Sequence, residues 1–494
     1  MRSIVVFLLV LLSVLPVEAN DQYREHCAQC HHPDRVGGMG PALLPENLER
    51  VPKKESAEVI ANGRPATQMP PFGDKLSPEE VQALVGYIYA PVTPAPTWSD
   101  ADIQASRVIW IANEKLPKKP LHNSDLMNLF MVVELGDHHV TVLDGDRFEP
   151  IARFPSRFAV HGGIKYSPDG RFAYMASRDG WISRFDLYAL KMTHEIRVGI
   201  NTRNVAVSGD GRYVMAANTL PRSLVVLDAR DLSLVKTIPL VNAKGESSRP
   251  SAVYSAPPRQ SFIVALKDIT EVWEIPLADK AGKPVTDFTV RAIELDAVLD
   301  DFLFDQAYKR LIGASRKGPN GQVVDLDAAK KIAEVPLTGM PHLASGIIWP
   351  YQDTEVLATP NLKEGEVTVV DLKTWQVIKR IPTLGPGFFM RSHENSPYAW
   401  VDVFFGKDKD AVHVIDKATL EVVKTIRPAP GKTSAHVEFT KSGGHALLSI
   451  WEMDGALVIY DAKSLEEVKR IPMKKPSGKY NVSNKINRSA GTSH

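Results

Sequence analysis

The chain has 494 residues, of which 44% are hydrophobic and 24% are charged, so its composition is that of a globular protein with about two to four domains. The net charge of +1 and the isoelectric point of about 7.8 exclude a broadly basic surface, and we expect no nucleic-acid partner.

Residues 1–19 are predicted to be a secretory signal peptide. They contain one early arginine, an apolar run and small residues before Ala19, after which we expect cleavage. The apolar run is short for a membrane span, and an uncleaved anchor is the alternative interpretation. No later segment is apolar over such a length, so we expect a periplasmic protein with no membrane span in its mature chain.

The two cysteines of the chain, Cys27 and Cys30, lie in the sequence Cys-Ala-Gln-Cys-His. A thioredoxin-like pair needs a preceding strand, whereas the preceding stretch is helical in character. A zinc site needs two more ligands, and no other cysteine exists. The spacing instead matches covalent attachment of one c-type haem through two thioether bonds, with His31 as the first iron ligand.

Met69 is the predicted second iron ligand, because cytochromes c commonly use methionine and the two prolines after it hold the chain extended. Met39 is the rival ligand, but it lies close to the cysteine pair. A helix capped by Ser77 is predicted to pack on the first helix. Residues 20–92 are therefore predicted to form an all-α cytochrome c domain, followed by an extended, proline-rich linker over 93–106.

Residues 107–494 contain a repeat in which an alternating apolar strand ends in aspartate and a second strand follows a short turn. Copies recur about every 45 residues, and a degenerate copy over 271–275 brings their number to eight. This pattern predicts an all-β, eight-bladed β-propeller in which each aspartate caps a turn. The strand over 107–114 is expected to close the ring by pairing with the last blade. The aspartates are Asp144, Asp186, Asp228, Asp325, Asp371, Asp416 and Asp461.

Four histidines interrupt the repeat in glycine- or proline-flanked segments before blade hairpins, which predicts that they share one end of the ring or its inner rim. Arginines accompany them. Because imidazole binds iron and guanidinium binds carboxylates, the set suits an iron-bearing ligand with several carboxylates. The histidines are His161, His342, His393 and His436, and the arginines are Arg157, Arg178, Arg203 and Arg391.

A cytochrome c domain joined to an eight-bladed propeller, with the segment 161–187 in its second blade, resembles the cytochrome cd nitrite reductase family. The resemblance covers nearly the whole mature chain, and it implies that the propeller binds a d1-type tetrapyrrole with His161 as an iron ligand. It also implies that Arg178 and Arg203 lie near the acidic side chains of the macrocycle. Arg391 and His393 are predicted to join this tetrapyrrole site.

The chain departs from the nitrite reductases of this family at their two distal histidines, which donate protons to bound nitrite. One of them matches His342, whereas the region 295–313, which corresponds to the other, has no histidine. His436 and Tyr480 instead stand where the reductases have no histidine and a phenylalanine. These departures favour the kind of family member that acts in haem d1 biosynthesis.

We therefore expect an enzyme that oxidises dihydro-haem d1 to haem d1 by converting a propionate side chain to an acrylate. His436 is the expected base, Tyr480 would orient the carboxylate or relay the proton, and His342 would be a distal iron ligand or hold the substrate. Two electrons would pass to the c-type haem and then to a periplasmic electron acceptor. Transient contacts with cytochrome cd nitrite reductase and a haem d1 assembly protein are also expected. An NO-forming nitrite reductase and a haem d1 carrier are the alternatives.

Overall fold

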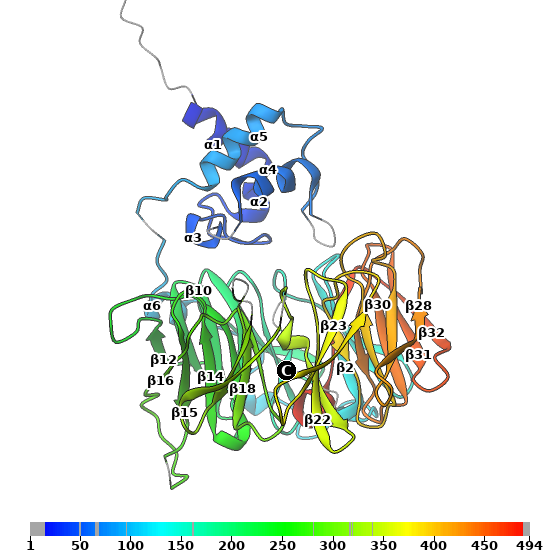
Figure 1. The fold of residues 1–494 in the computed structure, drawn as a ribbon. Helices are drawn as coiled ribbons and strands as arrows, with labels where there is room; N and C mark the ends of the chain where they lie inside the picture. Colours follow the sequence, from blue (N-terminus) through cyan, green and yellow to red (C-terminus); the bar gives the residue numbers. More distant parts are fainter. Residues whose placement is uncertain are drawn as a thin grey trace, which may run out of the picture. The chain divides into compact units, whose positions relative to one another are not determined.

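The computed structural model describes residues 15–48, 51–64, 69–94, 96–160, 163–279, 281–315, 318, 320–337 and 339–487 (Figure 1). Residues 1–14 of the predicted signal peptide and the predicted iron ligand His161 lie outside the described residues. The chain divides into two compact units, Met1–Thr97 and Trp98–His494. The division falls within the predicted linker.

The first unit is helical, as predicted. The helices are α1 (Leu15–His26), α2 (Ala28–His31), α3 (Pro45–Leu48), α4 (Lys53–Asn62) and α5 (Pro78–Ile88). Ser77 caps α5: its hydroxyl accepts a hydrogen bond from the backbone of Glu80, whose carboxylate accepts from the backbone N–H of Ser77. The apolar face of α5 packs on α1 and α4, which confirms the predicted pairing of the last and first helices.

The predicted linker is not extended throughout, because residues Asp100–Ala105 form helix α6. Ser99 and Asp102 make a second capping box at its start. The helix packs on two outer strands of the second unit, and the indole N–H of Trp98 donates to the carbonyl oxygen of Arg197 at 2.9 Å. Among the helices in the described part of the chain, none is long and apolar enough to cross a membrane.

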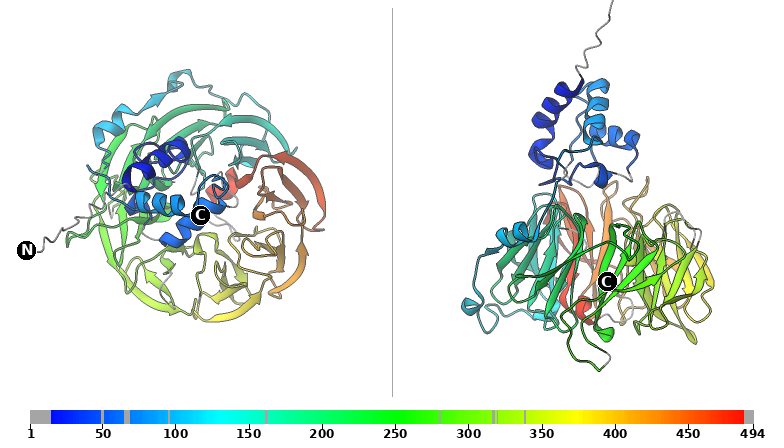
Figure 2. Two further views of the ribbon diagram at one scale, coloured as in Figure 1. Left: turned by 90° about the horizontal axis from the view of Figure 1, so that it is seen from above. Right: turned by 90° about the vertical axis from the view of Figure 1, so that its left-hand side faces the viewer.

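The second unit is an eight-bladed β-propeller of eight antiparallel sheets (Figure 2). From the inner to the outer strand, blade 1 consists of β33 (Pro476–Asn481), β2 (Leu129–Glu134), β3 (His139–Asp144) and β4 (Glu149–Pro155); blade 2 of β5 (Lys165–Tyr166), β6 (Phe172–Ala176), β7 (Trp181–Asp186) and β8 (Lys191–Arg197), with β1 (Val108–Ile109) outside β8; and blade 3 of β9 (Asn201–Val207), β10 (Tyr213–Leu220), β11 (Arg222–Asp228) and β12 (Leu234–Pro239). In the same order, blade 4 consists of β13 (Pro250–Ala256), β14 (Ser261–Leu266), β15 (Glu271–Pro276) and β16 (Arg291–Glu294); blade 5 of β17 (Asp301–Phe304), β18 (Arg310–Ala314), β19 (Gly321–Asp325) and β20 (Lys330–Val335); and blade 6 of β21 (Ile347–Tyr351), β22 (Thr354–Pro360), β23 (Glu366–Asp371) and β24 (Val377–Pro382). Blade 7 consists of β25 (Met390–Arg391), β26 (Tyr398–Asp402), β27 (Val412–Asp416) and β28 (Glu421–Ile426), and blade 8 of β29 (Ser434–Phe439), β30 (His445–Ile450), β31 (Gly455–Asp461) and β32 (Glu467–Met473).

The ring is closed by β33, the last strand in the described part of the chain, and not by the strand over 107–114, so that prediction is wrong. β33 pairs with β2 and completes blade 1 as its inner strand. β1 instead pairs with the outer strand β8, where Val108 lies opposite Glu195. A short strand of this kind covers an otherwise open sheet edge.

The seven repeat aspartates cap turns as predicted. In each of the seven, the carboxylate accepts hydrogen bonds from one or two backbone N–H groups in the turn between the third and fourth strands. Asp416, for example, accepts from Ala418 and Thr419 at 2.9 and 2.8 Å. We call the end of the ring that carries these turns the aspartate end.

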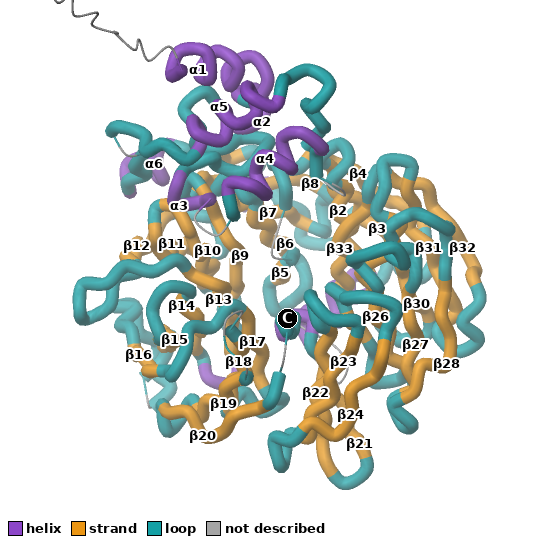
Figure 3. The backbone as a smooth tube through the Cα atoms, turned by 45° about the horizontal axis from the view of Figure 1, so that its top comes forward, coloured by secondary structure: helices purple, strands orange, loops and turns teal. Residues whose placement is uncertain are grey.

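Helix α7 (Val482–Asn487) follows β33 and lies inside the ring (Figures 2 and 3). It packs on β5, β33 and the short 3-10 helix η2 (Leu126–Asn128). The side-chain amide of Asn484 donates to the carboxylate of Glu438 at 3.0 Å and to the carbonyl of Phe439 at 2.8 Å. The chain thus ends its described part against the inner strands of blades 8, 1 and 2.

Candidate functional site

The Cys-Ala-Gln-Cys-His motif begins directly after α1 with Cys27 at the N-cap of helix α2, so about one helical turn separates Cys27 from Cys30. The two cysteines form no disulfide with each other. The buried His31 ring lies with Nδ1 2.8 Å from the carbonyl oxygen of Pro41. Burial lowers the pKa of His31. A neutral ring that donates from Nδ1 keeps the Nε2 lone pair for an iron.

The surroundings of His31 also fit a haem. A methyl group at Gly40 would lie 2.4 Å from Cε1 of His31, so only glycine lets the loop lie against the ring. Met69 is half-buried and packs against the cluster that contains Tyr23, whereas the side chain of Met39 is 42% exposed. The donor set of two thiols, an imidazole and a thioether suits a covalent haem c.

In the second unit, His436 lies at a β-bulge of the inner strand β29. The pairing with β30 breaks between Ala435 and Glu438, and His436 has a φ of 56°, which is strained for a residue other than glycine. Its ring contacts those of Phe389 and Tyr480, at centroid distances of 4.6 and 5.5 Å. Bulges commonly redirect a side chain beside an active site.

Asp402 connects His436 and His342 through hydrogen bonds. Its fully buried carboxylate accepts backbone N–H bonds from Phe388 at 2.7 Å, Phe389 at 3.0 Å and His436 at 3.1 Å. The carbonyl oxygen of Phe388 in turn lies 2.6 Å from Nδ1 of His342. Burial raises the pKa of Asp402 to about 6. Sequence analysis did not identify Asp402 as a site residue, because in sequence it looks like any other aspartate at the end of a strand.

His342 faces a carboxylate of the region 295–313. It precedes the 3-10 helix η4 (Leu343–Ser345), and its Nε2 lies 3.8 Å from Oδ2 of Asp301. Asp301 begins β17 and also accepts a hydrogen bond from the backbone of Ala344 at 2.8 Å. The region 295–313 thus supplies an acceptor and not a second imidazole.

Tyr480, on β33, lies between blades 1, 2 and 8. Burial raises the pKa of its phenol to about 12, so the hydroxyl keeps its proton at neutral pH. A methyl group at Gly163 would come within 3.3 Å of its Cε1, so the segment after His161 reaches Tyr480. The ammonium group of Lys485 lies 5.5 Å from the ring centre.

Buried charges surround this pair of rings. The Arg391 guanidinium lies 3.6 Å from Oε2 of Glu438, and both side chains are buried. Lys479, directly before Tyr480, is fully buried. Sequence reasoning missed Lys479 and Glu438, because each occupies an inner strand whose partners come from other blades.

His393 lies away from this group, and its assignment to the tetrapyrrole site stays a prediction. It follows β25 beside Tyr398, which pairs with Asp416 at the aspartate end, whereas Asp402 ends the same strand β26. Five residues of strand separate the two ends by about 13 Å at about 3.3 Å per residue. The His393 ring instead packs against Phe439, under the turn at Gly443.

Of the remaining arginines, Arg178 lies in blade 2, Arg203 lies in blade 3, and Arg157 lies in the connection between blades 1 and 2. Arg178 and Arg203 are neighbours: the backbone of Thr202 donates to the carbonyl of Arg178 at 3.4 Å, and Nε of Arg203 donates to the carbonyl of Ser251 at 2.8 Å. The Arg157 guanidinium makes a bidentate pair with Glu195, with both contacts at 2.9 Å. This bidentate pair occupies the guanidinium N–H groups that would bind a ligand carboxylate, so Arg157 is poorly placed to bind a ligand.

An aromatic wall flanks His342 and His436. Phe388 and Phe389 lie 4.5 Å apart between ring centres, and Phe404 contacts Phe388 at 5.3 Å and Trp451 at 5.0 Å. Aromatic faces suit a flat conjugated ligand, and the two histidines at their edge add iron-binding or proton-transfer groups.

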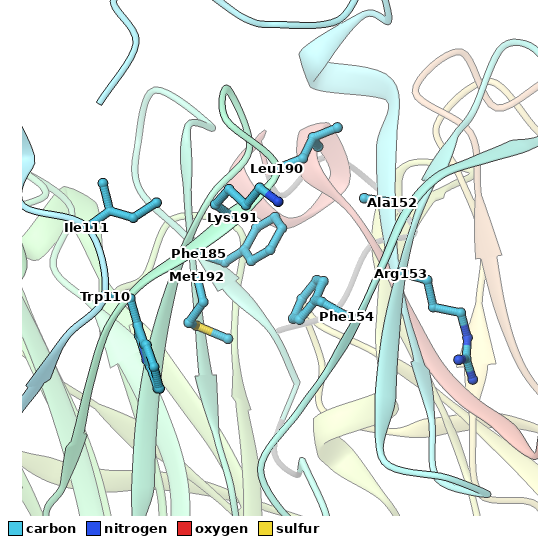
Figure 4. A pocket seen from close by; sticks show the side chains of 9 residues that line it. All are labelled: Trp110, Ile111, Ala152, Arg153, Phe154, Phe185, Leu190, Lys191 and Met192. Atoms are coloured by element: carbon cyan, nitrogen blue, oxygen red, sulfur yellow. The ribbon is translucent and has the colours of Figure 1, made fainter. Parts of the chain in front are cut away.

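A separate hollow of about 460 Å³ lies between the outer parts of blades 1 and 2 (Figure 4). The rings of Phe154 and Phe185 stack in it at 4.2 Å, and Met192 and Trp110 also line it. It contains none of the predicted site residues.

Comparison with known proteins agrees with both units. Residues 124–485 match the family described as cytochrome D1 heme domain, and residues 16–88 match cytochrome C oxidase, cbb3-type, subunit III. The dihydro-heme d1 dehydrogenase of Pseudomonas aeruginosa is 56% identical over 96% of this chain and 95% of its own. A solved structure of dihydro-heme d1 dehydrogenase NirN in complex with DHE superposes with a TM-score of 0.86 at 55% identity, over 95% of this chain and 100% of that one. Protein NirF of Pseudomonas aeruginosa is 29% identical over 73% of this chain and 92% of its own.

Proposed function

The chain belongs to the cytochrome D1 heme domain family, and from that premise we propose that it is an oxidoreductase of haem d1 biosynthesis that oxidises dihydro-haem d1 to haem d1. The observation that carries this proposal is 56% identity to the Pseudomonas aeruginosa dehydrogenase over 96% of the chain, since that length includes both the haem motif and the propeller. A nitrite reductase and a pure carrier are not favoured.

The reaction converts a propionate side chain, –CH2–CH2–COO⁻, to an acrylate, –CH=CH–COO⁻, with loss of two protons and two electrons. His436 takes one proton, and the other passes to water. A covalent haem c would supply a one-electron acceptor for the two electrons, and an external one-electron acceptor would reoxidise it. Cys27, Cys30, His31 and Met69 are the residues that hold this haem.

His436 is suited to take a proton because its ring stays neutral at neutral pH. Burial, with Lys479 next in importance, holds the pKa of His436 well below its usual range. The bulge and the Asp402 hydrogen bond fix its direction. Tyr480 keeps its own proton, so its hydroxyl serves as a hydrogen-bond donor that orients the substrate carboxylate and not as a base.

We assign substrate binding to residues on both faces of the macrocycle. Arg178, Arg203 and Arg391 bind its carboxylates, and His161 and His342 are the ligands for its iron. The aromatic wall packs against the macrocycle. We further propose that the protein is exported to the periplasm, passes electrons to an acceptor there, and meets cytochrome cd nitrite reductase and a haem d1 assembly protein transiently.

The test compares two substrates with one preparation of the haem-loaded protein. Dihydro-haem d1 with an electron acceptor should be converted, followed by the visible spectrum, whereas nitrite with a reduced donor should yield no nitric oxide above background. Nitric oxide formation without conversion of dihydro-haem d1 would replace the proposal with nitrite reduction. Binding of the substrate without any conversion would replace it with a carrier.

A further inference from the structure

Two lysines flank Tyr480 inside the ring. Lys485 is half-buried on α7, and its Nζ lies 5.5 Å from the centre of the Tyr480 ring. Lys165 is half-buried on the inner strand β5. A methyl group at Gly163 would lie 3.3 Å from Cε1 of Tyr480 and 3.8 Å from Nζ of Lys165, so the phenol ring and this second amine border the same small space.

Positive charge exceeds negative charge around these lysines. Burial holds the pKa of Lys485 well below its usual range, and the charges of Arg391 and Lys165 lower it further, against the opposing effect of Glu438. Among the described residues that act on Lys485, three cationic side chains, its own included, thus face one carboxylate. Like charges that converge in a half-buried place are unfavourable unless an anion joins them, so the place suits an anionic ligand.

The other groups that face this place do not supply the missing negative charge. Helix α7 packs on β5, β33 and η2, and η2 has no titratable side chain. Strand β33 brings Lys479, a buried amine, and Tyr480, whose phenol keeps its proton because burial raises its pKa to about 12. His436, on β29, is neutral, since burial and then Lys479 hold its pKa well below its usual range. The Asp402 carboxyl group already accepts three backbone hydrogen bonds.

On the basis of the proposed function, we propose that Lys485 and Lys165 bind, beside Tyr480, the carboxylate of the propionate side chain that is oxidised. Two carbon atoms join that carboxylate to the macrocycle, so a bound carboxylate fixes the carbon–carbon bond from which the hydrogens leave. An ammonium group acts as a point charge and lacks the fixed fork of a guanidinium group. It can therefore hold the carboxylate while the side chain changes from propionate to acrylate.

Such a site has a definite pH dependence. A carboxylate beside Lys485 favours the ammonium form, so binding raises the pKa of Lys485 from its lowered value. Wherever the pH lies between the pKa values of the free and the bound protein, substrate binding takes up a proton. The dissociation constant of dihydro-haem d1 should therefore rise as the pH rises through that range.

The experiment compares Lys485→Met with Lys417→Met. Lys417 is a matched control, because it is also half-buried and its Nζ donates to the carbonyl oxygen of His393 at 3.0 Å at the aspartate end. The dissociation constant of dihydro-haem d1 is measured by spectral titration of the haem-loaded protein from about pH 6 to about pH 10, together with the oxidation rate at saturation.

We expect Lys485→Met to bind dihydro-haem d1 about 10-fold more weakly at neutral pH, as for loss of a hydrogen bond between charged groups, and to lose most of the rise with pH. Lys165→Met should weaken binding by a similar factor. Both variants should also be slower at saturation, because the reacting carbon atoms are no longer held in place. Lys417→Met should keep the affinity and the pH dependence of the wild type.

A second probe separates the carboxylate from the rest of the macrocycle. Dihydro-haem d1 with its carboxylates converted to methyl esters should bind the wild type more weakly, and Lys485→Met should cost this ester no further affinity. An equal loss for the ester and the acid would show that Lys485 acts through packing alone and would overturn the proposal.

A Lys485→Met protein with the affinity and the pH dependence of the wild type would also overturn it. If Lys485→Met does not fold, Lys485→Gln serves instead, with the same expected losses. A wild-type protein that binds dihydro-haem d1 with this pH dependence but never oxidises it would refute the proposed function and leave the carboxylate site standing.

Discussion

The haem attachment site and the propeller site differ in how far apart their residues lie along the chain. The Cys27–His31 motif lies within five residues, and one short helix brings its side chains together. His342, Asp402, His436 and Tyr480 come from blades 6, 7, 8 and 1, and more than 130 residues separate the first from the last. The first site depends on local structure alone, whereas the second exists only when the ring has closed.

This difference explains where the supporting residues lie. Around His31 the support is a carbonyl and a glycine a few residues away, at Pro41 and Gly40. Around His436 it is a buried carboxyl group and a buried lysine amine on other strands, Asp402 and Lys479. A substitution at one site should therefore leave the other site intact.

The largest expected effect is the loss of the covalent haem in the double variant Cys27→Ser/Cys30→Ser, because no thioether bond can form. Haem absorbance that survives denaturation should disappear completely. Since the propeller site shares no residue with the motif, spectral titration should still detect binding of dihydro-haem d1. Equal loss of binding would show that the two sites are not independent.

The next effect is that of His436→Ala, which removes the proposed base. The rate of dihydro-haem d1 oxidation should fall by about 10²–10⁴-fold, the range of general acid–base catalysis, with covalent haem unchanged. His393→Ala is the matched control at the aspartate end and should keep a rate close to that of the wild type. A comparable fall in His393→Ala would restore His393 to the site.

Asp402→Asn should have a smaller effect on the rate and a clear effect on stability. An amide offers one acceptor oxygen, and its NH2 group would face a backbone N–H that the carboxylate now satisfies. We expect the free energy of unfolding to fall by about 1–3 kcal/mol, measured by urea denaturation. A variant of full stability and full activity would contradict the positioning role.

The smallest effect is expected for Asp416→Ala, at an aspartate-end turn. Loss of its two hydrogen bonds to Ala418 and Thr419 should lower the free energy of unfolding by about 0.5–1.5 kcal/mol and leave the oxidation rate unchanged. Asp371→Ala, which removes the same kind of turn from blade 6, should behave alike. A large loss of activity in either variant would contradict the claim that the aspartate end of the ring takes no part in catalysis.

Features that depend on neighbours in sequence could be predicted from sequence. The helix capped by Ser77 and the aspartate turns have their partners within four residues, so their patterns are visible along the chain. The number of blades follows from the repeat period. Ring closure could not be predicted in this way, because β33 has the polar sequence Pro-Ser-Gly-Lys-Tyr-Asn and only tertiary pairing shows that it joins β2, whereas β1 joins β8.

The propeller site was predictable only in part. His436 stood out through the family resemblance, and the structure surrounds it with Tyr480, Asp402 and Lys479. His393 was grouped with it because both interrupt the repeat, but which end of a blade a loop reaches depends on strand pairing. The contacts of Asp402 and Lys479 with His436 span 34 and 43 residues, and the chain carries no local pattern that predicts them.

The central claim is that the protein removes two hydrogens from dihydro-haem d1 and exports two electrons. The most direct measurement incubates the haem-loaded protein with dihydro-haem d1 and a one-electron acceptor, and determines product mass and reduced acceptor together. The account predicts a product lighter by two hydrogen atoms and two equivalents of reduced acceptor for each molecule converted. An unchanged substrate mass, or a lighter product without reduced acceptor, would contradict it.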